Sequence, residues 1–157
     1  MFNFLFWNLD KQPISALVAE LAREYEIDVV ILAECRTDSD MLKEQLSSTI
    51  GVEFSEILSS KARVRMLVSF DPSWVQPTSD SLHAMIRYIT HPGMPEFLVV
   101  AAHMPSKLRR SDTEQFSIAR QLRREIDRIE AEVGHERTLV VGDLNMNPFE
   151  EGMVSSD

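Results

Sequence analysis

The feature that most constrains the fold of this chain is the alternation of short apolar runs with longer segments of helical periodicity. Four runs are almost entirely apolar or β-branched, as in strands that are buried on both faces: residues 2–7, 28–33, 97–102 and 138–141. Three segments carry apolar side chains at the spacing of one helix face: residues 14–25, 39–49 and 112–133. Strands that alternate with helices predict an α/β or mixed α/β fold.

The middle of the chain predicts further strands at residues 53–58, 64–70 and 82–90. A turn is expected at residues 91–93, because His-Pro-Gly interrupts the apolar pattern there. The helix over 112–133 has the strongest boundary signals. Ser111 and Glu114 have the spacing of a capping box, and Gly134 is placed to end the helix.

Length and composition narrow the class of protein. The chain has 157 residues, which predicts one domain over residues 1–157 with a core of its own. Sixteen Lys and Arg against 25 Asp and Glu give a net charge of −9, which argues against coating of nucleic acid by bulk electrostatics. The single cysteine, Cys35, excludes an intrachain disulfide and a zinc site built from several thiolates. The apolar N-terminal run is too short for a membrane span, so we expect a cytoplasmic protein.

Each of the four apolar runs is followed closely by polar residues. These residues are Asn8, Glu34, His103, Asp143 and Asn145. Binding sites in layered α/β folds lie at the carboxyl ends of strands, so the five side chains converge if their strands share one edge. Each residue alone has an ordinary structural explanation, such as a turn or a helix cap. Their shared placement is what indicates a site.

The residue types indicate the chemistry. Two carboxylates, Glu34 and Asp143, together with the amides of Asn8 and Asn145 suit Mg²⁺ or Mn²⁺ rather than zinc or copper. Such a metal can polarise a phosphoryl oxygen and stabilise a leaving oxygen. An aspartate held by an amide can orient or deprotonate water, and a nearby histidine such as His103 can donate to a phosphate oxygen.

Four segments, taken in order, resemble the motifs of the endonuclease/exonuclease/phosphatase superfamily. They are Trp7-Asn8-Leu9, Leu32-Ala33-Glu34, Ala102-His103-Met104-Pro105-Ser106 and Gly142-Asp143-Leu144-Asn145-Met146-Asn147-Pro148. The last is the most specific, and the resemblance covers nearly the whole chain. It implies a four-layered α/β sandwich, in which two sheets pack face to face with helices outside. It also implies a deoxyribonuclease-like, metal-dependent phosphodiesterase or phosphomonoesterase.

The same resemblance implies a role for each residue. Glu34 would be the principal metal ligand, supported by Asn8, with Asp143 also at the metal site. Asp143 would orient or activate the attacking water, and Asn145 would hold the phosphate or that water. His103 would lie near the scissile phosphate, and Arg36 would contact substrate phosphate or form a surface ion pair.

Members of the superfamily are longer and carry a closing Ser-Asp-His motif, whereas this sequence ends Ser155-Ser156-Asp157. We therefore expect the N-terminal half of the sandwich, a truncated domain with little hydrolysis as this chain alone. A sheet that has lost its cover exposes an apolar face, so we also expect self-association through that face.

Three cations follow His103, namely Lys107, Arg109 and Arg110. They predict a clamp on a polyanionic substrate, either nucleic acid or a phosphorylated small molecule, unless the segment is a solvated loop. An alternative to an enzyme is a non-catalytic half-domain that binds a complementing chain or regulates a full-length relative. A nucleotide-binding module is disfavoured, because no glycine-rich phosphate loop follows any predicted strand.

Overall fold

The computed structural model covers the whole chain, and residues 2–108 and 111–154 are described here. The helices of the described residues are α1 (Ser15–Glu24), α2 (Ser39–Ile50), α3 (Asp112–Val133) and α4 (Glu151–Val154), with a 3₁₀ turn at Pro72–Trp74. The strands are β1 (Phe4–Asn8), β2 (Val29–Ala33), β3 (Ser55–Ile57), β4 (Val64–Val68), β5 (Val75–Asp80), β6 (Ala84–Ile89), β7 (Phe97–His103) and β8 (Thr138–Asp143).

The strands form two mixed sheets of four strands each. The first sheet has the order β1-β2-β4-β3, and the second has the order β5-β6-β7-β8. The pairs β1–β2 and β7–β8 are parallel, and the other pairs are antiparallel. Each parallel pair therefore presents two strand carboxyl ends side by side, which is the arrangement that the site requires.

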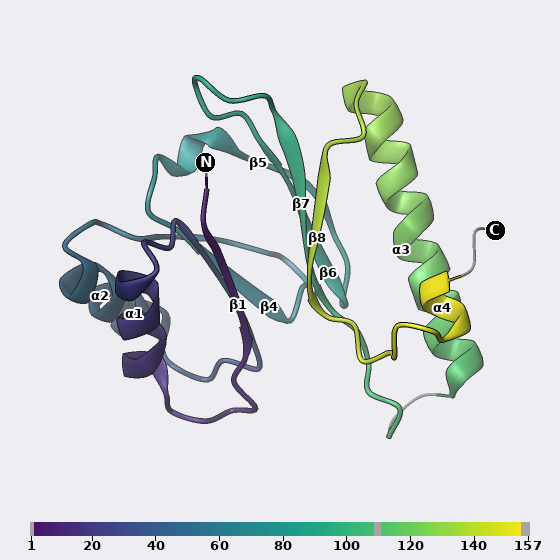
Figure 1. Cartoon of the computed structure of the whole chain (residues 1–157), viewed down its shortest axis with the longest axis horizontal. Coiled ribbons are helices and arrows are strands. Elements are labelled where there is room, and N and C mark those ends of the chain that lie inside the picture. The colour runs from purple at the N-terminus through teal and green to yellow at the C-terminus, as the bar shows by residue number, and fades with distance from the viewer. Residues whose placement is uncertain (1, 109–110, 155–157) are drawn as a thin grey trace.

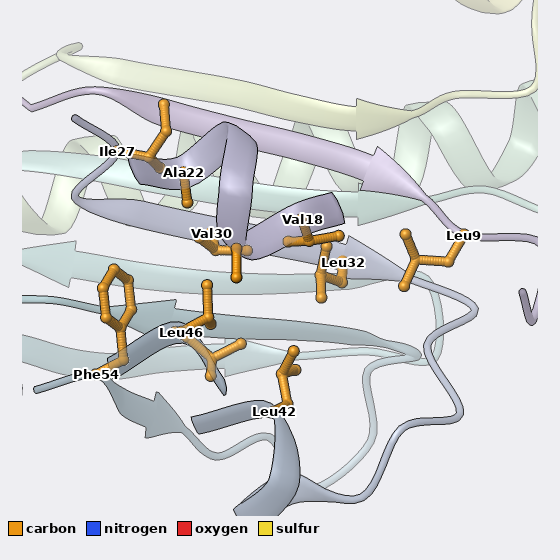
Figure 2. Packing of buried hydrophobic residues seen from close by; sticks show 11 residues of the cluster. Leu9, Val18, Ala22, Ile27, Val30, Leu32, Leu42, Leu46 and Phe54 are labelled. Atoms are coloured by element: carbon orange, nitrogen blue, oxygen red, sulfur yellow. The ribbon is translucent and has the colours of Figure 1, made fainter. Parts of the chain in front are cut away.

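The two sheets and the helices form four layers, as Figure 1 shows. Helices α1 and α2 cover the outer face of the first sheet, where Figure 2 shows Val18, Leu42 and Leu46 packed against β2 residues such as Val30. Helix α3 covers the outer face of the second sheet through a separate apolar cluster. The predicted four-layered α/β sandwich is thus confirmed.

A third cluster fills the space between the sheets. The two inner faces meet through the alternating residues of their central strands, among them Ile31, Met66, Met85 and Val99, each fully buried. The expectation of a sheet face without its cover is wrong for the part of the chain described, because each sheet covers the other. Among the strands, the edge strand β8 exposes two large apolar side chains, Leu139 and Val140, which are 38% and 45% exposed.

Local signals explain most of the elements. Helix α3 begins as predicted, because the Ser111 hydroxyl accepts from the Glu114 backbone N–H while the Glu114 carboxylate accepts from the Ser111 N–H. Strand β5 was not predicted, since it is an edge strand that contains Pro77 and shows no apolar alternation.

No helix in the described ranges has the length and apolar character needed to cross a membrane.

Candidate active site

The polar residues that follow the strands meet around one cavity. Asn8 ends β1, Glu34 follows β2, His103 ends β7 and Asp143 ends β8. The cavity has a volume of about 360 Å³, and its lining residues are Asn8, Lys11, Glu34, Arg63, His83, His103, Met104, Pro105, Ser106, Asp143 and Asn145. The fold therefore brings these strand ends to one cavity, and their roles as a functional site stay a prediction.

Three polar side chains on this rim form a hydrogen-bonded network. The Asn8 amide donates from Nδ2 to Asp143 Oδ2 at 2.9 Å, across the junction between the two sheets. The other carboxylate oxygen of Asp143 accepts from the Asn145 backbone N–H at 3.0 Å, and Asn145 Nδ2 donates to the Met104 carbonyl at 2.9 Å. The two donors, Asn8 Nδ2 and the Asn145 backbone N–H, hold the Asp143 carboxylate in one orientation.

Glu34 lines the same cavity and contacts the basic side chains of Lys11 and His103. Its Oε2 atom lies 3.1 Å from Lys11 Nζ, and its Oε1 atom lies 3.6 Å from His103 Nε2. The Glu34 side chain is 27% exposed, so the carboxylate is partly shielded but still reachable from the cavity. A carboxylate in this position attracts cations.

The backbone is strained at this rim. Asp10, Lys11, Glu34 and Asn145 all have positive φ, between 44° and 62°, although none is glycine. Such conformations cost about 1–3 kcal/mol each and persist where the surrounding structure enforces them, often at functional sites. Backbone bonds supply that constraint, because Leu9 N–H donates to the Ala33 carbonyl at 3.0 Å and Lys11 N–H donates to the Glu34 carbonyl at 3.1 Å.

Gly142 sets the position of Asp143. Its φ is 156°, and a Cβ atom built on it would lie 2.0 Å from the carbonyl oxygen of Ala102 on the neighbouring strand. No side chain can be placed there without moving one strand. The glycine therefore lets β8 approach β7 closely enough for His103 and Asp143 to stand in register.

Buried polar side chains hold the loops that carry the site. Gln115, in the first turn of α3, donates from Nε2 to the Pro105 carbonyl at 2.6 Å and to the Asn145 carbonyl at 3.3 Å. Arg65 on β4 donates to the Thr37 carbonyl at 2.5 Å, just after Glu34. Sequence reasoning did not identify either residue, since neither follows a strand or belongs to a motif.

Arg65 is itself fixed by a half-buried ion pair. Its Nε and Nη2 atoms donate to the Glu56 carboxylate at 2.7 Å and 2.9 Å. Burial raises the pKa of Glu56, but hydrogen bonds from Arg65 and Ser39 outweigh burial, so the pKa lies below its usual value of 4.5. The carboxylate therefore stays charged and keeps the guanidinium in place.

The structure brings together Asn8, Glu34, His103, Asp143 and Asn145, as the sequence predicts. Arg36 is exposed and does not belong to the lining of the cavity. Arg109 and Arg110 lie outside the described residues. Lys107 pairs with Glu150, and it lines a neighbouring hollow that Asp143 also lines.

The cavity contains three residues with basic side chains that sequence reasoning missed, namely Lys11, Arg63 and His83. Lys11 could have been suspected, because it comes two residues after the first motif, Trp7-Asn8-Leu9. Arg63 and His83 gave no signal, since each belongs to a connection between strands and enters the site through the tertiary fold.

The donor set fits a hard divalent cation that keeps much of its water. The Glu34 carboxylate already attracts the Lys11 ammonium, which shows that a cation is favoured there. Within residues 2–108 and 111–154, no group of three or more His, Cys, Asp or Glu side chains forms a closed metal cage. Mg²⁺ commonly binds through one or two carboxylates and several waters. The Glu34 carboxylate, with oxygen donors from Asn8 or Asp143, therefore offers the ligand types that Mg²⁺ needs.

No family model matches this sequence, and no curated protein matches it significantly. Solved structures share its fold. Truncated TDP2 from Caenorhabditis elegans superposes with a TM-score of 0.64 at 17% identity, covering 94% of this chain and 63% of that chain. TDP2 from D. rerio, complexed with single strand DNA product, gives 0.59 at 17% identity, with coverage of 96% and 63%.

An endonuclease/exonuclease/phosphatase family protein from Leptotrichia buccalis gives a TM-score of 0.58 at 12% identity, covering 94% of this chain and 67% of that chain. This chain thus spans less than two thirds of the length of the two TDP2 chains. The fold that the sequence motifs predict is confirmed.

Proposed function

We propose that this chain, which has the endonuclease/exonuclease/phosphatase fold, provides the active site of a divalent-metal-dependent phosphoesterase. The supporting observation is that the Asn8–Asp143–Asn145 network and the Glu34–His103 contact line one cavity. Two positioned carboxylates, amides that orient one of them and an imidazole can supply metal binding, a general base and a hydrogen-bond donor to phosphate.

Each side chain has a separate task in the proposed reaction. Asp143 accepts a proton from the attacking water, and the two hydrogen bonds to its carboxylate hold that base in position. Asn145 and Asn8 hold that water and the phosphate beside Asp143. His103 donates from Nε2 to a phosphoryl oxygen as charge develops. A divalent cation held by Glu34, Mg²⁺ or Mn²⁺, would polarise the phosphoryl group and stabilise the leaving oxygen.

Nucleic acid is the first substrate class to test for this site. The D. rerio structure with single strand DNA product shows a shared fold with a DNA-bound protein. Lys11 and Arg63 place two cationic side chains on the cavity of a chain whose net charge is −9. A local cationic site on an acidic protein suits a phosphate contact rather than general adhesion to polyanions.

Turnover by this chain alone is expected to be slow. The superfamily that it resembles uses a closing Ser-Asp-His motif, and that motif does not occur in the sequence. General acid or base groups typically contribute about 10²–10⁴-fold to rate, so a missing group of this kind lowers turnover by a similar factor.

The test is hydrolysis of a single-stranded oligonucleotide and of a small phosphodiester, with Mg²⁺, with Mn²⁺ and with a chelator. Product formation should require the metal and should fall by about 10²-fold or more in Asp143→Asn and Glu34→Gln. Asp40→Asn, an exposed carboxylate on α2, is the matched control and should leave the rate unchanged. Where turnover is undetectable, loss of Mn²⁺ binding in Glu34→Gln is the second readout. Hydrolysis that is indifferent to both site variants would contradict the proposal.

A second candidate function is a half-domain that is completed by another chain. The exposed Leu139 and Val140 on the edge strand β8 favour it, because edge strands with apolar side chains accept partners. A captured partner that raises metal-dependent hydrolysis by this chain would support this function. Full activity of the isolated chain would argue against it.

A further inference from the structure

The contact between Lys11 and Glu34 is the feature of this site that the proposed function leaves unexplained. The ammonium of Lys11 lies 3.1 Å from Glu34 Oε2, on the carboxylate that we assign to the metal. Both side chains line the cavity, so the ammonium lies inside the site rather than on a remote surface. The Lys11 ammonium carries the same sign of charge as a metal ion. It therefore competes with the metal for the Glu34 carboxylate.

The backbone makes this contact a fixed part of the fold. The Lys11 N–H donates to the Glu34 carbonyl at 3.1 Å, and both residues have positive φ, 62° and 50°. The two Cα positions are thus tied together. The far end of the lysine is less constrained, because its side chain is 43% exposed and has four rotatable bonds.

A partly exposed pair of this kind is weak, since water competes for both partners. A divalent cation attracts one carboxylate more strongly than an ammonium does at the same distance, because the Coulomb energy scales with charge. The metal should therefore displace Lys11 from Glu34. The displaced ammonium stays in the cavity, where a phosphate group would provide a new anionic partner.

Resting on the proposed function, we infer that Lys11 is an exchangeable counter-ion: it neutralises Glu34 until a divalent cation binds, and then it moves to the substrate phosphate. Two consequences follow from this exchange. Lys11 weakens metal binding when no phosphate is present. It strengthens phosphate binding once the metal is in place, so the two ligands bind cooperatively.

The first measurement is the dissociation constant of Mn²⁺ in the absence of phosphate, by calorimetry or by electron paramagnetic resonance. Lys11→Met should bind Mn²⁺ about three- to tenfold more tightly than the parent, because a neighbouring positive charge is removed. Lys11→Arg keeps the charge and should resemble the parent. Lys43→Met removes a lysine that pairs with Asp40 on α2 and should have no effect.

The second measurement is the affinity for inorganic phosphate at saturating Mg²⁺. Lys11→Met should bind phosphate several-fold more weakly than the parent, whereas without Mg²⁺ the two proteins should differ little.

The third measurement is the modification of lysines by an acylating reagent, read by mass spectrometry. Mg²⁺ should increase labelling of Lys11 relative to Lys43.

The outcomes separate the two proposals. If Mn²⁺ does not bind, or binds equally well to Glu34→Gln, the proposed metal site itself is wrong. If binding requires Glu34 but Lys11→Met has the affinity of the parent, the exchange is wrong and the metal site stands. Unchanged labelling of Lys11 at saturating Mg²⁺, or unchanged phosphate affinity in Lys11→Met, would likewise overturn the exchange.

Discussion

Single residues at the rim decide whether the site forms at all. The carboxylate of Asp143 reaches its hydrogen bond with Asn8 only if β8 lies close to β7. That close approach depends on the preceding residue, Gly142. Gly142 allows β8 to approach β7, because a Cβ atom at this position would lie 2.0 Å from the Ala102 carbonyl oxygen. The strained residues Glu34 and Asn145 act similarly, since a left-handed backbone aims each at the cavity.

Gly142→Ala should destabilise the protein by about 2–4 kcal/mol, from overpacking and backbone strain together. The measurement is urea unfolding. Gly93→Ala is the control, because Gly93 also has positive φ, at 85°, but open space lies around its Cβ position. Gly93→Ala introduces backbone strain without a steric clash, so its free energy of unfolding should fall by about 1 kcal/mol. Equal losses in the two variants would show that the close approach of β7 and β8 is not decisive.

At the level of elements, the carboxyl ends of β1, β2, β7 and β8 carry the site, and other elements hold the loops. Arg65 on β4 holds the loop after Glu34, and Gln115 on α3 ties two loops together. Glu56 on β3 holds Arg65, so a strand that does not itself line the cavity stabilises the loop after Glu34.

Glu56 should give this region a pH-dependent stability. The pKa of Glu56 is lowered in the folded protein, so its contribution is full above its ordinary pKa of 4.5 and is lost as pH falls through the lowered value. Glu56→Gln should therefore be less stable than the parent by about 1–2 kcal/mol at pH 6, with the difference shrinking towards pH 3. Urea unfolding at both values measures it.

Glu53→Gln serves as the control for that experiment, because Glu53 is an exposed glutamate three residues earlier. Its difference from the parent should be small at both pH values. A Glu56→Gln difference that stays constant with pH would show that the ion pair with Arg65 does not govern the acid response.

On the scale of the whole molecule, one buried arginine links the two sheets. Arg87 on β6 is 1% exposed, and it donates to Asp80 Oδ1 at 2.8 Å and to the Leu58 carbonyl at 2.7 Å. Leu58 follows β3 of the other sheet, so the guanidinium bridges the interior of the sandwich. Burial raises the pKa of Asp80, but hydrogen bonds from Arg87 and Ser60 outweigh burial and lower it overall.

Asp80→Asn should lower the free energy of unfolding more than Arg87→Met does. This order tests whether the buried guanidinium of Arg87 depends on the Asp80 carboxylate. Removing the carboxylate charge leaves a guanidinium buried without a counter-ion, at a cost of about 3–5 kcal/mol. Removing the arginine leaves Asp80 with the Ser60 backbone N–H and with some solvent, so the loss should be smaller. Urea unfolding of both variants and of the double variant measures the coupling. The reverse order would contradict this assignment.

Self-association stays a prediction, now placed on an edge rather than on a sheet face. Light scattering should show a mass above that of one chain. Leu139→Lys with Val140→Lys should restore the monomer, because charge on an edge strand prevents pairing. Leu58→Lys is the control, since Leu58 is 80% exposed away from that edge. A monomer at all concentrations in the parent chain would refute the prediction.

The sequence by itself determined the order of the elements and the kinds of side chain at their ends. Apolar runs and helical periodicity are local properties, so α3 and the strands that end in Asn8, His103 and Asp143 could be predicted from them. Asn8, Glu34, His103, Asp143 and Asn145 were found for the same reason, since each follows an apolar run directly or within four residues.

Only the tertiary structure decided which side chains face one another. Lys11, Arg63 and His83 enter the cavity because separate loops are brought to one rim, and no local pattern encodes that distance. The mutual cover of the two sheets likewise depends on how residues far apart in sequence pack. Such contacts follow from the summed burial of both sheets, which no single segment specifies.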